Sequence, residues 1–172
     1  PDLWLIAFDG TERELVADVI AMIGDHPWIL PVWQDNDADG LPEDYKMKFA
    51  AEIVARLAPH HTHVISSRVD NDDALATGFC ANTEAYAQAV LSRQPNLQDF
   101  WVSFPLGAQL IGDQFQLYPY TTSPFVSRCT TRALLEARPK ALVNHVNHNK
   151  VYERGRTVFQ AITNRPSWLQ VI

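Results

Sequence analysis

The sequence predicts an α/β fold in which helices flank a mixed sheet. Three observations support this: short continuous apolar runs typical of buried strands, segments of helical periodicity that follow them, and short connections between the two. The alternation extends over about the first 95 residues. With 172 residues, 47% of them hydrophobic, the chain can bury a core, and we expect one packed domain rather than disorder.

Each predicted element has its own signal. Thr11 and Glu14 have the spacing of a capping box, which predicts a helix start after the first strand. Pro31 would confine the second strand to a sheet edge or a bulge. Gly112-Asp113 separates two apolar runs and predicts a hairpin turn. The expected elements are strand 3–8, helix 15–23, strand 28–33, helix 43–57, strand 62–69, helix 75–90, strand 100–104 and hairpin 109–118.

Composition narrows the class of protein. The net charge of −6 disfavours nucleic acid as a partner, because a nucleic-acid surface needs basic residues. No apolar run reaches the 18–20 or so residues of a membrane helix, and no signal peptide opens the chain. Cys80 and Cys129 are the only cysteines, and we expect reduced thiols rather than a disulfide. We therefore expect a cytoplasmic protein without a transmembrane segment.

Two acidic clusters share the letters Asp-Asn-Asp. The first, in the Asp35–Asp39 stretch, has aspartates at positions 1, 3 and 5 of a calcium loop and Gly40 at position 6. Position 12 of such a loop is a bidentate glutamate, but here it is Lys46. A solvated acidic turn is the favoured interpretation. Calcium binding by this loop, in a non-enzymatic binding domain, stays open as the alternative.

The second cluster is VDNDDALA, residues 69–76, between a predicted strand and a predicted helix. Ligands of open α/β sheets bind outside the carboxyl ends of strands. Asp70 and Asp72 can face one side of an extended segment, and Asp73 can cap the following helix. Two carboxylates suit a divalent ion that also takes phosphate oxygens from a substrate. The alternative is that Asp70 and Asp72 are only turn residues.

The same residues resemble a known family. SRVDNDDALA is similar to the R-[LIV]-D-x-D-D-A-L segment of the rhamnosyltransferase family of GT-A glycosyltransferases. Further segments follow in the family's order and extend the resemblance over nearly the whole chain: WLIAFDGTE, FWVSFPLGAQL, LYPYTTSPFVS, HNKVYE and RPSWLQVI. The family's first strand–helix unit and its histidine-containing tail have no counterpart here. We therefore expect a fragment of a longer chain, truncated at its N-terminal side.

The resemblance implies a GT-A-like, Rossmann-like mixed sheet with flanking helices. It implies transfer of a sugar, rhamnose in the named family, from a nucleoside diphosphate donor to a carbohydrate or glycan acceptor, with Mn²⁺ or Mg²⁺. Asp72 would be the main metal ligand. Asp70 would bind the metal or the ribose, and Asp73 would support the ion or cap the helix. Asp9 resembles a base-contacting carboxylate, and Arg68 would offset the acidic cluster or bind a phosphate.

The remaining expectations concern the division of the domain and the roles of individual side chains. Residues 1–95 would form the nucleotide-sugar part of the domain, and residues 96–172 the acceptor side. His148 is a candidate third metal ligand or diphosphate contact, and a surface loop histidine is the alternative. Trp168 is the tryptophan we would test for sugar stacking. His60, His61 and His63 are interpreted as a solvated loop. The catalytic base stays unknown among four carboxylates, Asp99, Asp113, Glu136 and Glu153. Phosphatase chemistry of the aspartyl-phosphate type is strongly disfavoured, because Ala7 occupies the nucleophile position before Asp9.

Overall fold

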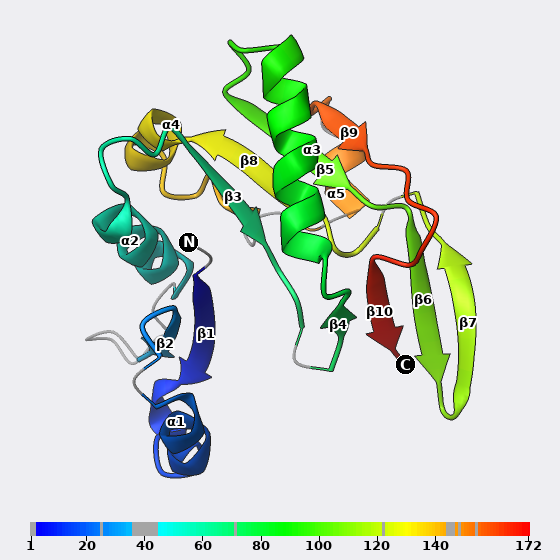
Figure 1. The fold of residues 1–172 in the computed structure, drawn as a ribbon. Helices are drawn as coiled ribbons and strands as arrows, with labels where there is room; N and C mark the ends of the chain where they lie inside the picture. Colours follow the sequence, from blue (N-terminus) through cyan, green and yellow to red (C-terminus); the bar gives the residue numbers. More distant parts are fainter. Residues whose placement is uncertain are drawn as a thin grey trace. The chain divides into compact units, whose positions relative to one another are not determined.

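The structure is a computed structural model that describes residues 3–24, 26–35, 45–70, 72–121, 123–143, 147, 149–153 and 155–172. It confirms a mixed α/β chain of helices and several sheets (Figure 1). Two compact units are present, Pro1–Ala58 and Pro59–Ile172. This boundary differs from the expected division at residue 95, and the single-domain assignment stays a prediction. No described helix is long and apolar enough to cross a membrane.

The first unit has a parallel pair of strands. β1 (Trp4–Asp9) and β2 (Ile29–Gln34) pair in parallel, as the alternating pattern predicts. The 3₁₀ turn η1 (Gly10–Glu12) and α1 (Ala17–Ile23) connect them, and α2 (Tyr45–Arg56) follows. Because the described sheet here has only two strands, β2 is an edge strand that tolerates Pro31.

The predicted capping box does not form. Thr11 lies inside η1, and its side chain donates to Asp9 Oδ1 at 2.7 Å. It therefore does not act as the N-cap that a capping box with Glu14 requires. α1 begins only after Val16, which makes no side-chain cap. The Asp9 carboxylate is the better placed acceptor, because it comes directly at the strand end and also takes the Thr11 N–H at 2.9 Å.

The second unit contains two four-stranded sheets. The first has the order β3-β8-β5-β9, formed by β3 (His63–Ser67), β8 (Ser127–Thr131), β5 (Asp99–Ser103) and β9 (Val158–Gln160). β8 is antiparallel to both β3 and β5, and β9 is parallel to β5. Therefore β3, β5 and β9 run in the same direction, and their carboxyl ends meet at one edge of the sheet.

The second sheet has the order β4-β10-β6-β7. Its strands are β4 (Ala74–Leu75), β10 (Trp168–Val171), β6 (Leu106–Ile111) and β7 (Gln114–Pro119), which lie side by side in Figure 1. β6 and β7 form the predicted hairpin, with Gly112 at φ +61° as the first central residue of a type II′ turn requires. The two-residue β4 begins directly after the Asp73 position.

Helix α3 (Phe79–Arg93) covers one face of the first sheet. Its buried residues Phe79, Ala87 and Val90 share a core with Phe100 and Val102 of β5. A second cluster closes the opposite face of β5. It is formed by Trp101, Val126, Val143 and Val151, the last from α5 (Asn149–Glu153). The short α4 (Arg132–Ala137) follows β8. β5 is thus buried on both faces, which explains its continuous apolar sequence.

Trp168 belongs to the core, so the expected sugar platform is wrong. Its side chain is 1% exposed, and its indole N–H donates to the Phe104 carbonyl at 2.8 Å. The ring lies over Gly107, where an added Cβ would come closer than 3.0 Å to three ring atoms. Burial of a large ring with its one donor satisfied is the ordinary core role of tryptophan.

The remaining side-chain predictions have mixed outcomes. Cys80 is exposed and Cys129 is buried, and neither is in a disulfide, as expected. His63 is not in a solvated loop: it opens β3, and its Nε2 atom is buried with no hydrogen-bond partner in the described part of the chain.

Candidate functional site

The aspartate segment lies where the sequence places it, at the carboxyl end of a strand. β3 ends at Ser67, and Arg68, Asp70, Asp72 and Asp73 follow before β4 begins at Ala74. The Asp73 N–H donates to the Asp70 carbonyl at 3.1 Å, which closes a turn. The three aspartates therefore belong to one short turn that follows the carboxyl end of β3.

Arg68 and Asp70 form an ion pair. Arg68 Nη2 lies 2.9 Å from Asp70 Oδ2, and both side chains are about half exposed. An ion pair in this exposure contributes little stability, on the order of 0–1 kcal/mol, but it lowers the local density of negative charge. The contact agrees with one of the two roles expected of Arg68, and its binding of a phosphate stays a prediction. One oxygen of Asp70 is left for another ligand.

Asp73 does not cap the next helix, and that prediction is wrong. α3 begins at Phe79, five residues beyond β4's start, and its N-cap Gly78 has no side-chain capping bond. Asp73 Oδ1 instead accepts the Val171 backbone N–H of β10 at 3.0 Å. Partial burial raises the pKa of Asp73, and the charges of Asp72 and Asp70 act in the same direction. The role of Asp73 is therefore to join the loop to β10.

Asp72 is the carboxylate of the cluster that is accessible to a ligand. It is exposed at the turn, and within the described residues no hydrogen bond or ion pair involves its side chain. Across the described residues, no three histidine, cysteine, aspartate or glutamate side chains gather as a metal-binding group. Metal binding by Asp72 and the second oxygen of Asp70 stays a prediction. Two carboxylates would hold Mn²⁺ or Mg²⁺ only if phosphate oxygens or water completed the coordination shell.

Asp9 belongs to the first unit, at the carboxyl end of β1. Its Oδ1 accepts both the N–H and the hydroxyl of Thr11, and these hydrogen bonds lower the pKa of Asp9. Its position at the end of a parallel strand is one from which a side chain can meet a ligand. Nucleotide contact by Asp9 stays a prediction.

Asp35, the first position of the expected calcium loop, is bound by two cations. Arg13 Nη2 lies 2.8 Å from Oδ1, and Lys48 Nζ lies 3.5 Å from Oδ2. The hydrogen bond from Arg13 is the main cause of the lowered pKa of Asp35. The Arg13 guanidinium also stacks 4.3 Å from the centre of the Trp33 ring. Residues 36–44 lie outside the described residues, so the rest of that loop stays a prediction.

Two of the four candidate bases are held in ion pairs. Asp99 makes a bidentate contact with Arg128, at 2.8 and 2.7 Å, and the Arg128 side chain is only 12% exposed. Glu136 pairs with Arg132 one helical turn away. Asp113 lies exposed in the hairpin turn. The Glu153 side chain and His148 lie outside what the structure describes.

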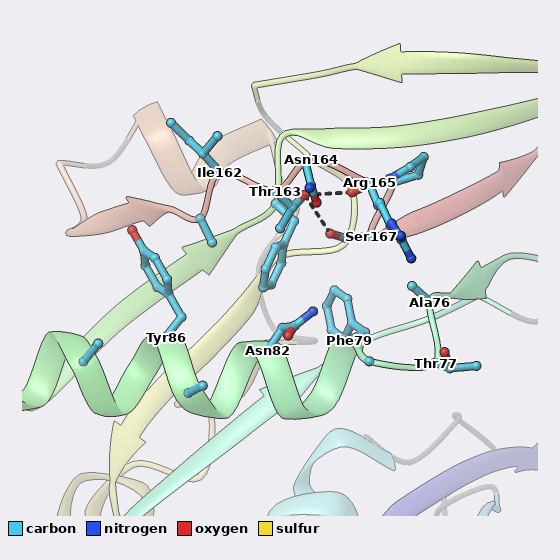
Figure 2. Close-up of a pocket in the computed structure, with 16 residues that line it drawn as sticks. Ala76, Thr77, Phe79, Asn82, Tyr86, Ile162, Thr163, Asn164, Arg165 and Ser167 are labelled. Carbon is cyan, nitrogen blue, oxygen red and sulfur yellow. Dashed lines mark hydrogen bonds between the residues drawn. The ribbon is translucent and has the colours of Figure 1, made fainter.

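A groove opens at the same edge of the first sheet. It has a volume of about 910 Å³ and runs between α3 and the segment 161–167 that follows β9 (Figure 2). Asn82, Phe79 and Tyr86 come from the helix, and Asn164 and Arg165 from the opposite wall. The Tyr86 hydroxyl donates to the Gln160 carbonyl at 2.8 Å, which holds the two walls together.

The groove does not include the aspartates, but the strand register relates the two. Ser67, Ser127, Val102 and Phe159 lie in one row across β3, β8, β5 and β9. Three strand spacings of about 4.8 Å put the ends of β3 and β9 about 14 Å apart. In addition, Ala76 donates its N–H to the Ser167 carbonyl at 3.0 Å, so the groove begins three residues after Asp73.

Sequence reasoning missed this groove. One signal was visible in the sequence, namely that the segments lining the groove are poor in charge. Of the lining residues only Arg165 is charged, although the chain carries 20 acidic residues. The lining comes from residues 76–89, residue 104 and residues 161–167, and no periodicity relates segments so far apart. Comparisons of the chain with protein families, with curated proteins and with solved structures find no match. The function is therefore inferred from the aspartate loop after β3 and from the groove beside α3.

Proposed function

We propose that the chain is a metal-dependent glycosyltransferase domain. It would move a sugar, rhamnose by the resemblance described above, from a nucleoside diphosphate to an acceptor hydroxyl. The observation that carries the proposal is the loop after β3, where Asp72 is exposed while Asp70 and Asp73 are held by Arg68 and Val171.

The arrangement suits a diphosphate that arrives with its cation. Negative charge grows on the diphosphate as its bond to the sugar breaks, and a bound Mn²⁺ or Mg²⁺ would stabilise this charge. Asp72 and the second oxygen of Asp70 would hold the ion. Arg68, half exposed beside them, can turn its remaining N–H groups toward a phosphate. Asp73 would keep the loop in place through its bond to β10.

The groove is the proposed site of the acceptor. A pocket of about 910 Å³ with aromatic and amide groups fits a saccharide, which needs apolar contact on its ring faces and hydrogen bonds at its hydroxyls. Tyr86 supplies aromatic surface, and Asn82 and Asn164 supply amides from opposite walls (Figure 2). Because the groove and the aspartates share one sheet edge, an acceptor hydroxyl can approach a donor held there.

A calcium-stabilised binding domain is the alternative function, and the contacts of Asp35 disfavour it. Both oxygens of this first ligand are engaged by Arg13 and Lys48, which a calcium ion would have to displace. Calcium takes six to eight oxygen ligands, so the loss of one carboxylate weakens a loop that already carries lysine at its last position.

Isothermal titration calorimetry tests the proposal. Mn²⁺ is titrated into the chain together with UDP, GDP or dTDP, and Asp72→Ala is compared with Asp18→Ala, which removes an exposed carboxylate from the first turn of α1. We expect binding that needs both metal and nucleotide, a loss of at least about tenfold (1.4 kcal/mol) in Asp72→Ala, and none in Asp18→Ala.

Two results would contradict the transferase proposal. One is an Asp72→Ala variant that binds metal and nucleotide as the unaltered chain does. The other is binding of Ca²⁺ without nucleotide that Asp37→Ala abolishes, which would support the calcium-stabilised domain.

A further inference from the structure

The outer edge of β7 is open and carries no charged residue. β7 is the last strand of the order β4-β10-β6-β7, and in the described part of the chain no strand pairs with its outer side (Figure 1). Its sequence is QFQLYP, with a proline only at the final position. Natural edge strands of this length are usually protected by charges, bulges or central prolines, because an open edge pairs with other strands.

The hairpin register shows which backbone groups point outward. In a hairpin with a two-residue turn, the residues flanking the turn, Ile111 and Gln114, form a hydrogen-bonded pair. The bonded pairs then alternate, and the Tyr120 N–H indeed donates to the Pro105 carbonyl at 2.6 Å. The backbone groups of Phe115 and Leu117 therefore point away from β6 and are available to another strand.

The side chains of these two residues are also available. Phe115 and Leu117 are each 63% exposed and lie on the same face of the sheet. That face continues with apolar residues on the neighbouring strands, Leu110 of β6 and Val171 of β10, in register with Phe115. An exposed apolar surface of this kind marks an interaction site.

A row of glutamine side chains leads to the same edge on the opposite face. Gln109 Nε2 donates to Gln170 Oε1 at 3.1 Å, and Gln116 Nε2 donates to Gln109 Oε1 at 3.4 Å. These residues are direct partners across β10, β6 and β7. The row ends at Gln116, whose Oε1 has no hydrogen-bond donor among the described residues. A further amide in register would continue it, as in other glutamine ladders.

We infer that two copies of this chain associate through antiparallel pairing of their β7 strands, centred on Gln116. The register places Phe115 of one copy opposite Leu117 of the other, with the outward backbone groups of both matched. Gln116 then faces its own equivalent in a non-hydrogen-bonded pair, where side chains lie closest. The strand is complementary to itself at this register, which is the requirement of a two-fold interface. The β4-β10-β6-β7 sheets of the two copies then form one continuous sheet.

The inference is tested by sedimentation velocity on the whole chain over a concentration series. We expect reversible association from 19.4 kDa to twice that mass and no further. Gln116→Lys and Gln116→Glu each place like charges opposite each other at the two-fold axis and are expected to weaken the dimer at least tenfold. Gln88→Lys, which adds the same charge on the exposed face of α3, is the matched control and should associate normally.

Mixing the two charged variants distinguishes this register from other modes of association. Lysine on one copy then faces glutamate on the other, and the mixture is expected to regain the dimer that each variant alone has lost. Amide hydrogen exchange gives a second readout: Phe115 and Leu117 should become protected on association, while Gln116 should not change. A chain that stays monomeric throughout, one that grows beyond a dimer, or a mixture that fails to recover would overturn the inference.

Discussion

Replacement of Gly107 by alanine is expected to destabilise the second unit strongly. The added methyl would come closer than 3.0 Å to three atoms of the Trp168 ring, which cannot move into solvent because it is 1% exposed. The ring also packs against Phe125, with centroids 5.3 Å apart, and donates to the Phe104 carbonyl. The substitution therefore has to displace β10 or its tryptophan.

The size of the effect lies between two known limits. Overpacking a core costs about 1–3 kcal/mol, and loss of a buried tryptophan costs about 3–5 kcal/mol. Because the clash involves a rigid ring rather than a flexible side chain, we expect Gly107→Ala to lower the free energy of unfolding by about 2–5 kcal/mol. Urea unfolding followed by tryptophan fluorescence and far-UV circular dichroism measures this, provided that the two transitions coincide.

Gly78→Ala is the matched control. An added Cβ at Gly78 would have Asn82 Nδ2 as its nearest neighbour, at 3.4 Å, which is ordinary contact. Its φ of −91° is open to alanine. We expect a change within about 0.5 kcal/mol. A loss below about 1 kcal/mol in Gly107→Ala would refute the close approach of Trp168 to β6.

Two further predictions concern titrating groups. Asp35→Asn should destabilise the first unit at neutral pH. The pKa of Asp35 is lowered chiefly by its hydrogen bond from Arg13, so its contribution exists above the ordinary aspartate pKa and disappears as the pH falls through the lowered value. The midpoint temperatures of thermal unfolding of the two proteins should therefore converge as the pH is lowered from 7 to 2. A difference between the midpoints that stays constant with pH would contradict this. Burial raises the pKa of Cys129 to about 12, so a disulfide reagent at pH 8 should modify Cys80 alone in the folded chain, and equal modification rates would contradict the buried position.

Local patterns in the sequence predicted local structure well. The apolar run that became β1, the helical spacing of α2 and the Gly112-Asp113 turn each depend on residues close in sequence, and the structure has all three. The position of the aspartates after β3 was predictable for the same reason. Strand ends are marked by a change from apolar to polar residues, and that change is visible before any fold is known.

Pairings between distant residues were not predictable. β3 pairs antiparallel with β8, whose partner residues lie 60 to 68 positions away, and no periodicity identifies that partner. The same limit explains two of the wrong side-chain roles, those of Asp73 and Trp168. The role of Asp73 is decided by its contact with Val171, and the burial of Trp168 by its contact with Gly107. Neither partner is close in sequence, so neither contact was visible there.

The bond between Asp73 and Val171 has a consequence for the order of folding. The two residues are 98 positions apart, so the loop that holds Asp72 is among the contacts that close late, after the intervening chain has collapsed. A chain in which β5 and β8 are already paired can still lack β10 on β6. In that intermediate the helix α3 and the first sheet would be native while the aspartate loop is not. The metal binding that we propose for this loop should therefore be the last property to appear during refolding.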